Sequence, residues 1–198
     1  MNEKRIKKFH PLKQRRDLFV VAGDPQSPLG LISWGSVAGV ALEALDLARA
    51  GGLQVKLLIP KLLYPVAEEV YADFLRGVQG GLVVEQSHQG QLYRVLRMYV
   101  NLPAGVQPLA RSGSNPILPA SIVQRLRKIA VLIQRVDQQA DQLPVARAGR
   151  ADRAIKPRYA DLFIGSLECV QRPDQSPRGV GEDAPTGAAV HIDGSGLH

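Results

Sequence analysis

Glu85 and His88 form the acid–imidazole pair that the sequence places at the end of a predicted strand. A carboxylate close to an imidazole can support proton transfer. The alternative is structural: Glu85 hydrogen-bonds the amides of the loop that follows it, and His88 contacts a partner subunit. We favour the structural interpretation and expect no catalytic residue in this chain, because no serine here lies in a nucleophile elbow.

Gly35 and Ser36 precede a segment of helical period. Free backbone amides at such a position can bind an anion. The spacing of Gly35 and Gly39 excludes a dinucleotide fingerprint, and no Gly-Lys-Ser ending marks a P-loop. Gly35 and Ser36 are therefore weak candidates for an anion site, and a purely structural turn is the alternative. In either case Ser36 is expected to cap the helix with its side chain.

Tyr64 and Pro65 form an aromatic-proline turn between an apolar run and the next helical segment. Proline fixes its own backbone angle, so the turn is expected to be rigid. The tyrosine ring could fill a pocket of a partner, or it could pack within the chain. The residues alone leave both interpretations open.

Short apolar runs alternate with helix-period segments through the middle of the chain, which predicts an open α/β sheet. The run at 55–59 is apolar throughout, as in a parallel strand covered on both faces, and 17–22 reads as an edge strand. Glycines at 77, 80 and 81 are expected to close the second helix. Strands are predicted at 17–22, 30–33, 55–59, 82–85 and 106–110, and helices at 37–50, 66–76, 91–100 and 119–135.

The net charge of +7 is concentrated at the start of the sequence. Residues 1–16 hold seven basic side chains against Glu3, whereas 17–198 holds 18 basic and 17 acidic side chains. Such an arm can bind phosphates, or it can be a solvated linker or a segment that docks against a subunit. We favour the linker, since no aromatic interleaving accompanies the charges.

The composition sets the remaining limits. The 198 residues suffice for one α/β domain, expected at 17–137 after a basic linker arm at 1–16. From residue 138 the periodicity ends, so 138–198 is expected to be a disordered tail. Cys169 is the single cysteine, which excludes an internal disulfide and a cysteine-rich metal site. No apolar run of membrane-spanning length and no signal peptide is visible, so a cytoplasmic location is expected.

Four motifs follow one another along the chain: Trp34-Gly35-Ser36, Leu62-Leu63-Tyr64-Pro65, Val83-Val84-Glu85-Gln86 and Gly90-Gln91-Leu92. In this order and spacing they resemble the alpha subunit of the 2-oxoacid:ferredoxin oxidoreductases, most closely the 2-oxoglutarate type. The similarity covers roughly residues 1–130, and the opening segment resembles the linker before the corresponding domain.

The resemblance implies a transketolase C-terminal-like domain, a three-layer sheet of about five mostly parallel strands with helices on both faces. It implies a parent complex that uses thiamine diphosphate, magnesium, an iron-sulfur cluster and coenzyme A, none of them bound by this chain alone. The expected partners are the beta subunit, the rest of the alpha subunit and, through the complex, ferredoxin. The residues expected at the interface are Tyr64, Pro65, Glu85, His88, Gly90 and Gln91.

Two functions from different classes follow. The first is a structural, assembly-forming domain that supports oxidative decarboxylation of a 2-oxoacid by the whole oxidoreductase complex. The second is a stand-alone binding module whose basic arm engages nucleic acid or an acidic partner. A third use, phosphate binding at the Gly35–Ser36 turn, would make the domain a small-ligand binder.

Overall fold

The computed structural model describes residues 2–142. Of the tail predicted at 138–198, residues 138–142 belong to a helix, and 143–198 lie outside the described residues. Five strands form a single sheet in the order β1-β3-β2-β4-β5. β1 pairs with β3 in antiparallel fashion, and the other neighbours are parallel. The strands are β1 Phe19–Gly23, β2 Leu29–Ser33, β3 Lys56–Pro60, β4 Gly80–Glu85 and β5 Gly105–Ala110. The predicted fold class, an open and mostly parallel sheet, is confirmed.

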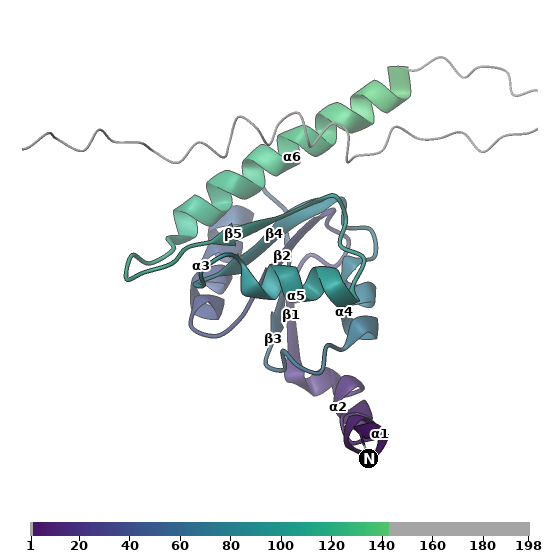
Figure 1. Ribbon diagram of the computed structural model, residues 1–198. Helices are drawn as coiled ribbons and strands as arrows, with labels where there is room; N and C mark the ends of the chain where they lie inside the picture. Colours follow the sequence, from purple (N-terminus) through teal and green to yellow (C-terminus); the bar gives the residue numbers. More distant parts are fainter. Residues whose placement is uncertain (1, 143–198) are drawn as a thin grey trace, which may run out of the picture.

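Helices cover both faces of this sheet (Figure 1). α3 and α6 pack on one face, and α4 and α5 pack on the other. Neighbouring strand residues point to opposite layers, as the period of a strand requires: Leu57 joins the α3–α6 core and Leu58 the α4–α5 core. The helices are α3 Val37–Ala50, α4 Glu68–Leu75, α5 Gln91–Tyr99 and α6 Pro119–Gln142.

α6 continues past the predicted end near Arg135 and reaches Gln142. Val136 is buried and extends the apolar spacing of Ile129 and Ile133. No glycine or proline interrupts the sequence between Pro119 and Pro144, so nothing in the local chemistry stops the helix earlier. In Figure 1 this helix runs across the sheet and projects beyond it. None of the helices within 2–142 is both long and apolar enough to cross a membrane.

Gly80 and Gly81 do not close a helix, contrary to the prediction; they begin β4. A Cβ on Gly80 would lie 2.7 Å from Cγ2 of Ile129, so the glycine lets α6 approach the sheet. A Cβ on Gly81 would lie 1.8 Å from the carbonyl oxygen of Gly30 on β2. Both glycines are required by close packing inside the sheet and not by a turn.

The predicted side-chain cap at Ser36 is also wrong. Ser36 has helical backbone angles and makes no capping hydrogen bond. The amide of Ala38 donates instead to the carbonyl of Gly35 at 3.2 Å. The first turn of α3 is therefore closed by the backbone itself.

The basic arm is folded. It contains α1 Asn2–Lys7, α2 His10–Lys13 and a short 3-10 turn at Arg16–Leu18. The amide of Lys61, just after β3, donates to the carbonyl of Leu18 at 2.8 Å. The arm thus meets the domain at the end of β3, and Figure 1 shows it extending away from the sheet there.

Candidate functional site

The expected site residues share one edge of the sheet. Gly35 and Ser36 follow β2, Tyr64 and Pro65 follow β3, and the Glu85 loop follows β4. Because β2, β3 and β4 are parallel, their carboxyl ends lie at the same edge, which is where open α/β sheets place functional groups. The 3-10 turn of the arm reaches this edge as well, through Lys61.

Glu85 is fully enclosed at this edge, with 0% of its surface exposed. Its Oε2 accepts hydrogen bonds from the amide of Leu92 at 2.9 Å and the hydroxyl of Ser87 at 2.8 Å. Its Oε1 accepts from the amide of Tyr93 at 3.1 Å. Leu92 and Tyr93 lie in the first turn of α5, where amides lack helical partners and the dipole favours an anion. The carboxylate therefore fixes the start of α5 to the end of β4.

The loop between Glu85 and α5 needs unusual backbone angles. Gln89 has a φ of 69° and Gly90 a φ of 66°, and a glycine adopts such angles without steric cost. Gln86 donates to the carbonyls of Gly113 and Asn115, at 2.8 and 3.2 Å. The loops after β4 and β5 are thereby joined into one surface.

His88 lies on the exposed part of that loop. Within the described chain no hydrogen bond joins it to Glu85, whose oxygens are already occupied by two amides and a hydroxyl. The geometry therefore gives Glu85 the structural role of holding the loop amides. It leaves the imidazole of His88 facing outward, where a partner could contact it.

The Gly35–Ser36 turn is open. Gly35 has a φ of 60°, and a Cβ placed on it would meet no atom within 4 Å. Ser36 is exposed, and the indole N–H of the preceding Trp34 is buried without a hydrogen-bond partner among the described residues. The turn itself is therefore open to solvent, although the amide of Ala38 already donates to the carbonyl of Gly35. The turn remains a candidate anion site.

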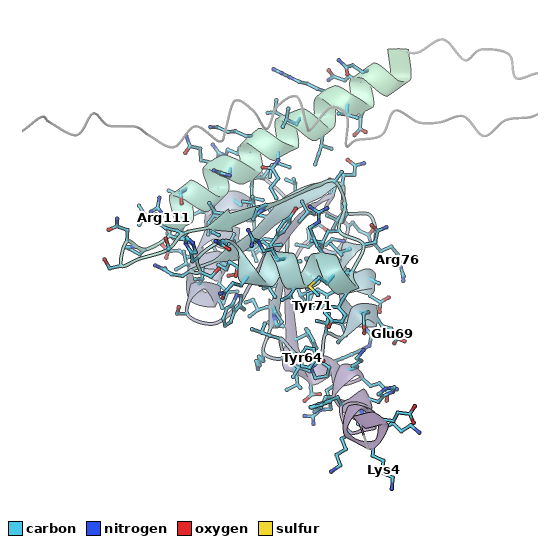
Figure 2. The ribbon with its side chains drawn as sticks, viewed as in Figure 1. Lys4, Tyr64, Glu69, Tyr71, Arg76 and Arg111 are labelled. Atoms are coloured by element: carbon cyan, nitrogen blue, oxygen red, sulfur yellow. The ribbon has the colours of Figure 1, made fainter. Side chains whose placement is uncertain are left out.

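Tyr64 and Pro65 adopt different environments. Pro65 is buried behind a cis peptide bond, whereas the side chain of Tyr64 is 64% exposed. The ring of Tyr64 stacks edge-on against Phe9 of the arm, with centroids 6.2 Å apart. Figure 2 shows Tyr64 beside the arm. The structure does not link Tyr64 to the Glu85 loop through any hydrogen bond or ring contact in the described part of the chain.

Ion pairs hold the arm on α4. Nζ of Lys13 donates to both carboxylate oxygens of Glu68, at 2.8 and 3.0 Å. Arg16 donates to Asp73 at 2.7 Å. The hydrogen bond from Lys13 lowers the pKa of Glu68, and the bond from Arg16 does the same for Asp73. A cavity of about 160 Å³ lies between the two segments, lined by His10, Lys13, Gln14, Glu68 and Glu69.

The described residues offer no ligand set for a metal. Residues 2–142 contain no cysteine and no group of three His, Cys, Asp or Glu side chains that could hold an ion. This part of the chain therefore does not fit the iron-sulfur cluster that the resemblance implies for the parent complex. At the carboxyl ends of the strands, the chain presents the exposed rings of Tyr64 and Phe9, the outward-facing imidazole of His88 and the rigid Glu85 loop.

Sequence reasoning missed how the arm is attached. Its helices are short, and their contacts with Glu68 and Asp73 are 55 and 57 residues away along the chain. The available signal was the acidic cluster of Glu68, Glu69 and Asp73, whose charge is opposite to that of the arm.

Comparison with known proteins identifies relatives for most of the described chain. No family model matches the sequence. The chain is 32% identical over 129 residues to subunit alpha of 2-oxoacid:ferredoxin oxidoreductase 2 from Aeropyrum pernix. This match covers 64% of the present chain and 20% of the relative. The chain is 33% identical over 100 residues to ketoisovalerate oxidoreductase subunit VorB from Methanothermobacter marburgensis, covering 50% of this chain and 28% of that subunit.

A solved structure agrees with these relatives. The 2-oxoglutarate:ferredoxin oxidoreductase from Magnetococcus marinus, with 2-oxoglutarate, coenzyme A and succinyl-CoA bound, matches 65% of this chain at 32% identity and a TM-score of 0.60. The match covers 22% of that chain. The present chain thus spans between a fifth and three tenths of the length of these three proteins. Over the matched part, the chain is homologous to the alpha subunits of 2-oxoacid:ferredoxin oxidoreductases.

Proposed function

We propose that this chain is a structural, assembly-forming domain of a 2-oxoacid:ferredoxin oxidoreductase alpha subunit. The observation that carries the proposal is the homology over about two thirds of the chain. The matched proteins share action on a 2-oxoacid, and the 2-oxoglutarate type is supported by the solved relative with 2-oxoglutarate and coenzyme A bound. In this proposal the whole complex, and not this chain, performs the coenzyme A-dependent oxidative decarboxylation.

The carboxyl edge of the sheet supplies the docking surface in this proposal. Tyr64 and Phe9 present two aromatic rings that are 64% and 42% exposed, and aromatic side chains are enriched at protein interfaces. The Glu85 loop is held rigid by its own hydrogen bonds, so little conformational freedom would be lost on docking. His88 and Gln91 lie exposed on or beside that loop, while Gly90 is buried within it.

The partners follow from the same proposal. They are the beta subunit and the rest of the alpha subunit, in the cytoplasm, with ferredoxin as the acceptor of the whole complex. Thiamine diphosphate, magnesium, the cluster and coenzyme A would be held by those other parts. The role of this chain would be to stiffen the surroundings of the cofactor cleft.

Cross-linking can test this interface, because the lysines of the described chain are unevenly placed. Lys4, Lys7 and Lys8 lie on the arm and Lys61 precedes the Tyr64 turn, whereas Lys128 lies on α6. The full chain, tagged in its source cells, would be treated with a lysine-reactive cross-linker and analysed by mass spectrometry. We expect links from the arm and Lys61 to oxidoreductase subunits.

Paired variants make this test decisive. Tyr64→Ala should reduce recovery of those subunits several-fold, and Leu47→Ala, which truncates an exposed apolar side chain on α3, should leave it unchanged. Isolated chain should not reduce viologen with 2-oxoglutarate and coenzyme A. Absence of every oxidoreductase subunit from the cross-linked products, or viologen reduction by the chain alone, would contradict the proposal.

A further inference from the structure

The near-neutral charge of the α/β part conceals two regions of opposite sign. Residues 17–85 hold four basic and eight acidic side chains. Residues 86–136 hold seven basic side chains and no aspartate or glutamate. The seven are Arg94, Arg97, Arg111, Arg125, Arg127, Lys128 and Arg135.

The fold gathers this acid-free stretch on one side of the domain. β5 is an edge strand next to β4, and α5 and α6 pack against β4 from the two faces of the sheet. Of the seven cations, Arg125 is half-buried and the others are exposed. Figure 2 shows Arg111 near the start of α6, well away from Tyr64 and Glu69 on the arm side. Arg94 and Arg97 lie on α5, and Arg111 lies directly after β5. We call these three exposed arginines the arginine face.

The charges of the arginine face are not neutralised within the described residues. There, the ion pairs join Lys13, Arg15, Arg16 and Arg76 to carboxylates, and none involves a cation of 86–136. Arg94 donates instead to the amide oxygen of Gln89 at 3.0 Å, and Arg111 to the carbonyl of Pro116 at 3.0 Å. These neutral acceptors orient the guanidinium groups and leave their charge available.

Exposed apolar side chains accompany the arginines. Met98 is 76% exposed, Leu118 57% and Tyr99 43%. Arg97 lies over the ring of Tyr93, 5.9 Å from its centroid. Arginine, methionine and tyrosine are enriched in protein interfaces, whereas lysine, aspartate and glutamate are depleted. The composition therefore favours a protein partner over a nucleic acid, whose backbone offers little to bury Met98 and Leu118.

The β5 edge itself is poorly suited to strand addition. Pro108 lies within the strand and has no amide to donate. A partner would therefore contact side chains on both flanks of β5 and would not extend the sheet. Charge complementarity requires that its surface be acidic.

We propose that the arginine face is a docking surface for a protein with an acidic surface patch that also carries apolar side chains. The arginine face adjoins the Glu85 loop through the hydrogen bond from Arg94 to Gln89 and lies away from Tyr64. The proposal does not require that the chain be a subunit of an oxidoreductase. Charged contacts set the association rate and the salt dependence, and Met98, Tyr99 and Leu118 supply the apolar contact.

The test uses the full chain and three defined probes. They are a glutamate–tyrosine copolymer, polyglutamate of equal length and a 20-base-pair DNA duplex, each labelled for fluorescence anisotropy over a salt series. We expect the copolymer to bind more tightly than polyglutamate or the duplex at low salt. Arg94→Gln with Arg97→Gln should weaken copolymer binding about tenfold. The matched arm variant, Lys7→Gln with Lys8→Gln, removes the same charge and should change it less than threefold.

Met98→Ser should weaken binding of the copolymer several-fold and leave the binding of polyglutamate unchanged, since only the copolymer carries aromatic rings that Met98 can contact. An equal loss from the arm variant would move the site to the arm. Tighter binding of the duplex would make the face a nucleic-acid surface, and no copolymer binding at 50 mM salt would overturn the proposal. Thermal unfolding of every variant would confirm that the fold is intact.

Discussion

Two charged side chains are buried in this sheet at opposite ends, and they are solvated in different ways. Glu85 ends β4 and is 0% exposed, whereas Lys56 begins β3 and is 4% exposed. The carboxylate of Glu85 accepts a hydrogen bond from the first turn of α5. Nζ of Lys56 donates at 2.8 Å to the carbonyl of Arg76, directly after the end of α4. Each charge thus lies at the helix end whose dipole favours it.

The number and rigidity of their partners separate the two. Glu85 accepts three hydrogen bonds between 2.8 and 3.1 Å, two of them from backbone amides. Lys56 has one such bond, a second carbonyl at 3.5 Å and the ring of Phe74 at 5.5 Å. Burial lowers the pKa of Lys56, and Asp24 offsets part of that effect. The comparison indicates that Glu85 is integral to the local structure, while Lys56 is replaceable.

Glu85→Gln should have the largest effect. The amide group of glutamine brings a donor toward the amides of Leu92 and Tyr93, so at least one buried donor loses its acceptor. We expect the free energy of unfolding to fall by about 2–4 kcal/mol, measured by urea denaturation of the full chain.

The matched control is Glu43→Gln, an exposed glutamate on α3, which should change stability by less than about 0.5 kcal/mol. Ser87→Ala should fall between the two, because it removes one donor to Glu85 and leaves the backbone donors in place. Equal effects of Glu85→Gln and Glu43→Gln would show that the carboxylate does not hold the loop.

Lys56→Met tests the buried charge at the start of β3. The lowered pKa means that the folded protein releases this proton more readily than the unfolded chain, so Lys56 destabilises the fold while charged. Its penalty is full below the folded pKa and disappears as the pH rises toward the ordinary value of 10.5. At neutral pH we expect the variant to differ from the natural chain by about 1 kcal/mol or less.

The pH dependence distinguishes this account from simple loss of a contact. The natural chain should gain stability relative to Lys56→Met as the pH approaches 10.5, in paired urea titrations at each pH. Lys61→Met, which removes an exposed lysine, should show no such relative change. A difference between the natural chain and Lys56→Met that stays constant with pH would contradict the inferred burial effect.

The elements of the fold were predictable because each has a regular pattern. The helix at 37–50 is found at Val37–Ala50, and the edge strand predicted at 17–22 is found at Phe19–Gly23. Long-range packing was not predictable. Gly80 and Gly81 read as turn residues, and only the approach of Ile129 and Gly30 explains them.

The candidate site was predictable in position but not in detail. An acid at the end of an apolar run marks Glu85, whereas the positive φ angles of Gln89 and Gly90 became visible only in the structure. The sequence could not decide between proton transfer and loop support, since that depends on which amides of α5 reach the carboxylate. The separation of acidic residues in 17–85 from basic residues in 86–136 is present in the sequence. It does not appear in the net charge of 17–198, because the two regions largely cancel.

Tyr71→Phe extends the comparison to a buried polar group without a partner. Tyr71 is 1% exposed, its hydroxyl has no hydrogen-bond partner among the described residues, and burial raises its pKa. Removing an unsatisfied hydroxyl is neutral or stabilising. We expect the free energy of unfolding to stay constant or rise by up to about 1 kcal/mol, and a loss above that size would reveal a hydrogen bond to water.

Glu68→Gln should have the smallest effect, because a charge at the surface is solvated by water whether or not it has a partner. The side chains of Glu68 and Lys13 are 40% and 36% exposed, so screening reduces the pair to about 0.2–0.5 kcal/mol. The pKa of Glu68 is lowered from 4.5 by Lys13, so the contribution is present above pH 4.5 and is lost as the pH falls below it. Urea denaturation at low and high salt, with Glu69→Gln as the control, would detect it. If Glu68→Gln lowered the free energy of unfolding as much as Glu85→Gln, the ion pair of Lys13 and Glu68 would have to be shielded from water in solution. The difference in burial between Glu68 and Glu85 would then not explain their contributions to stability.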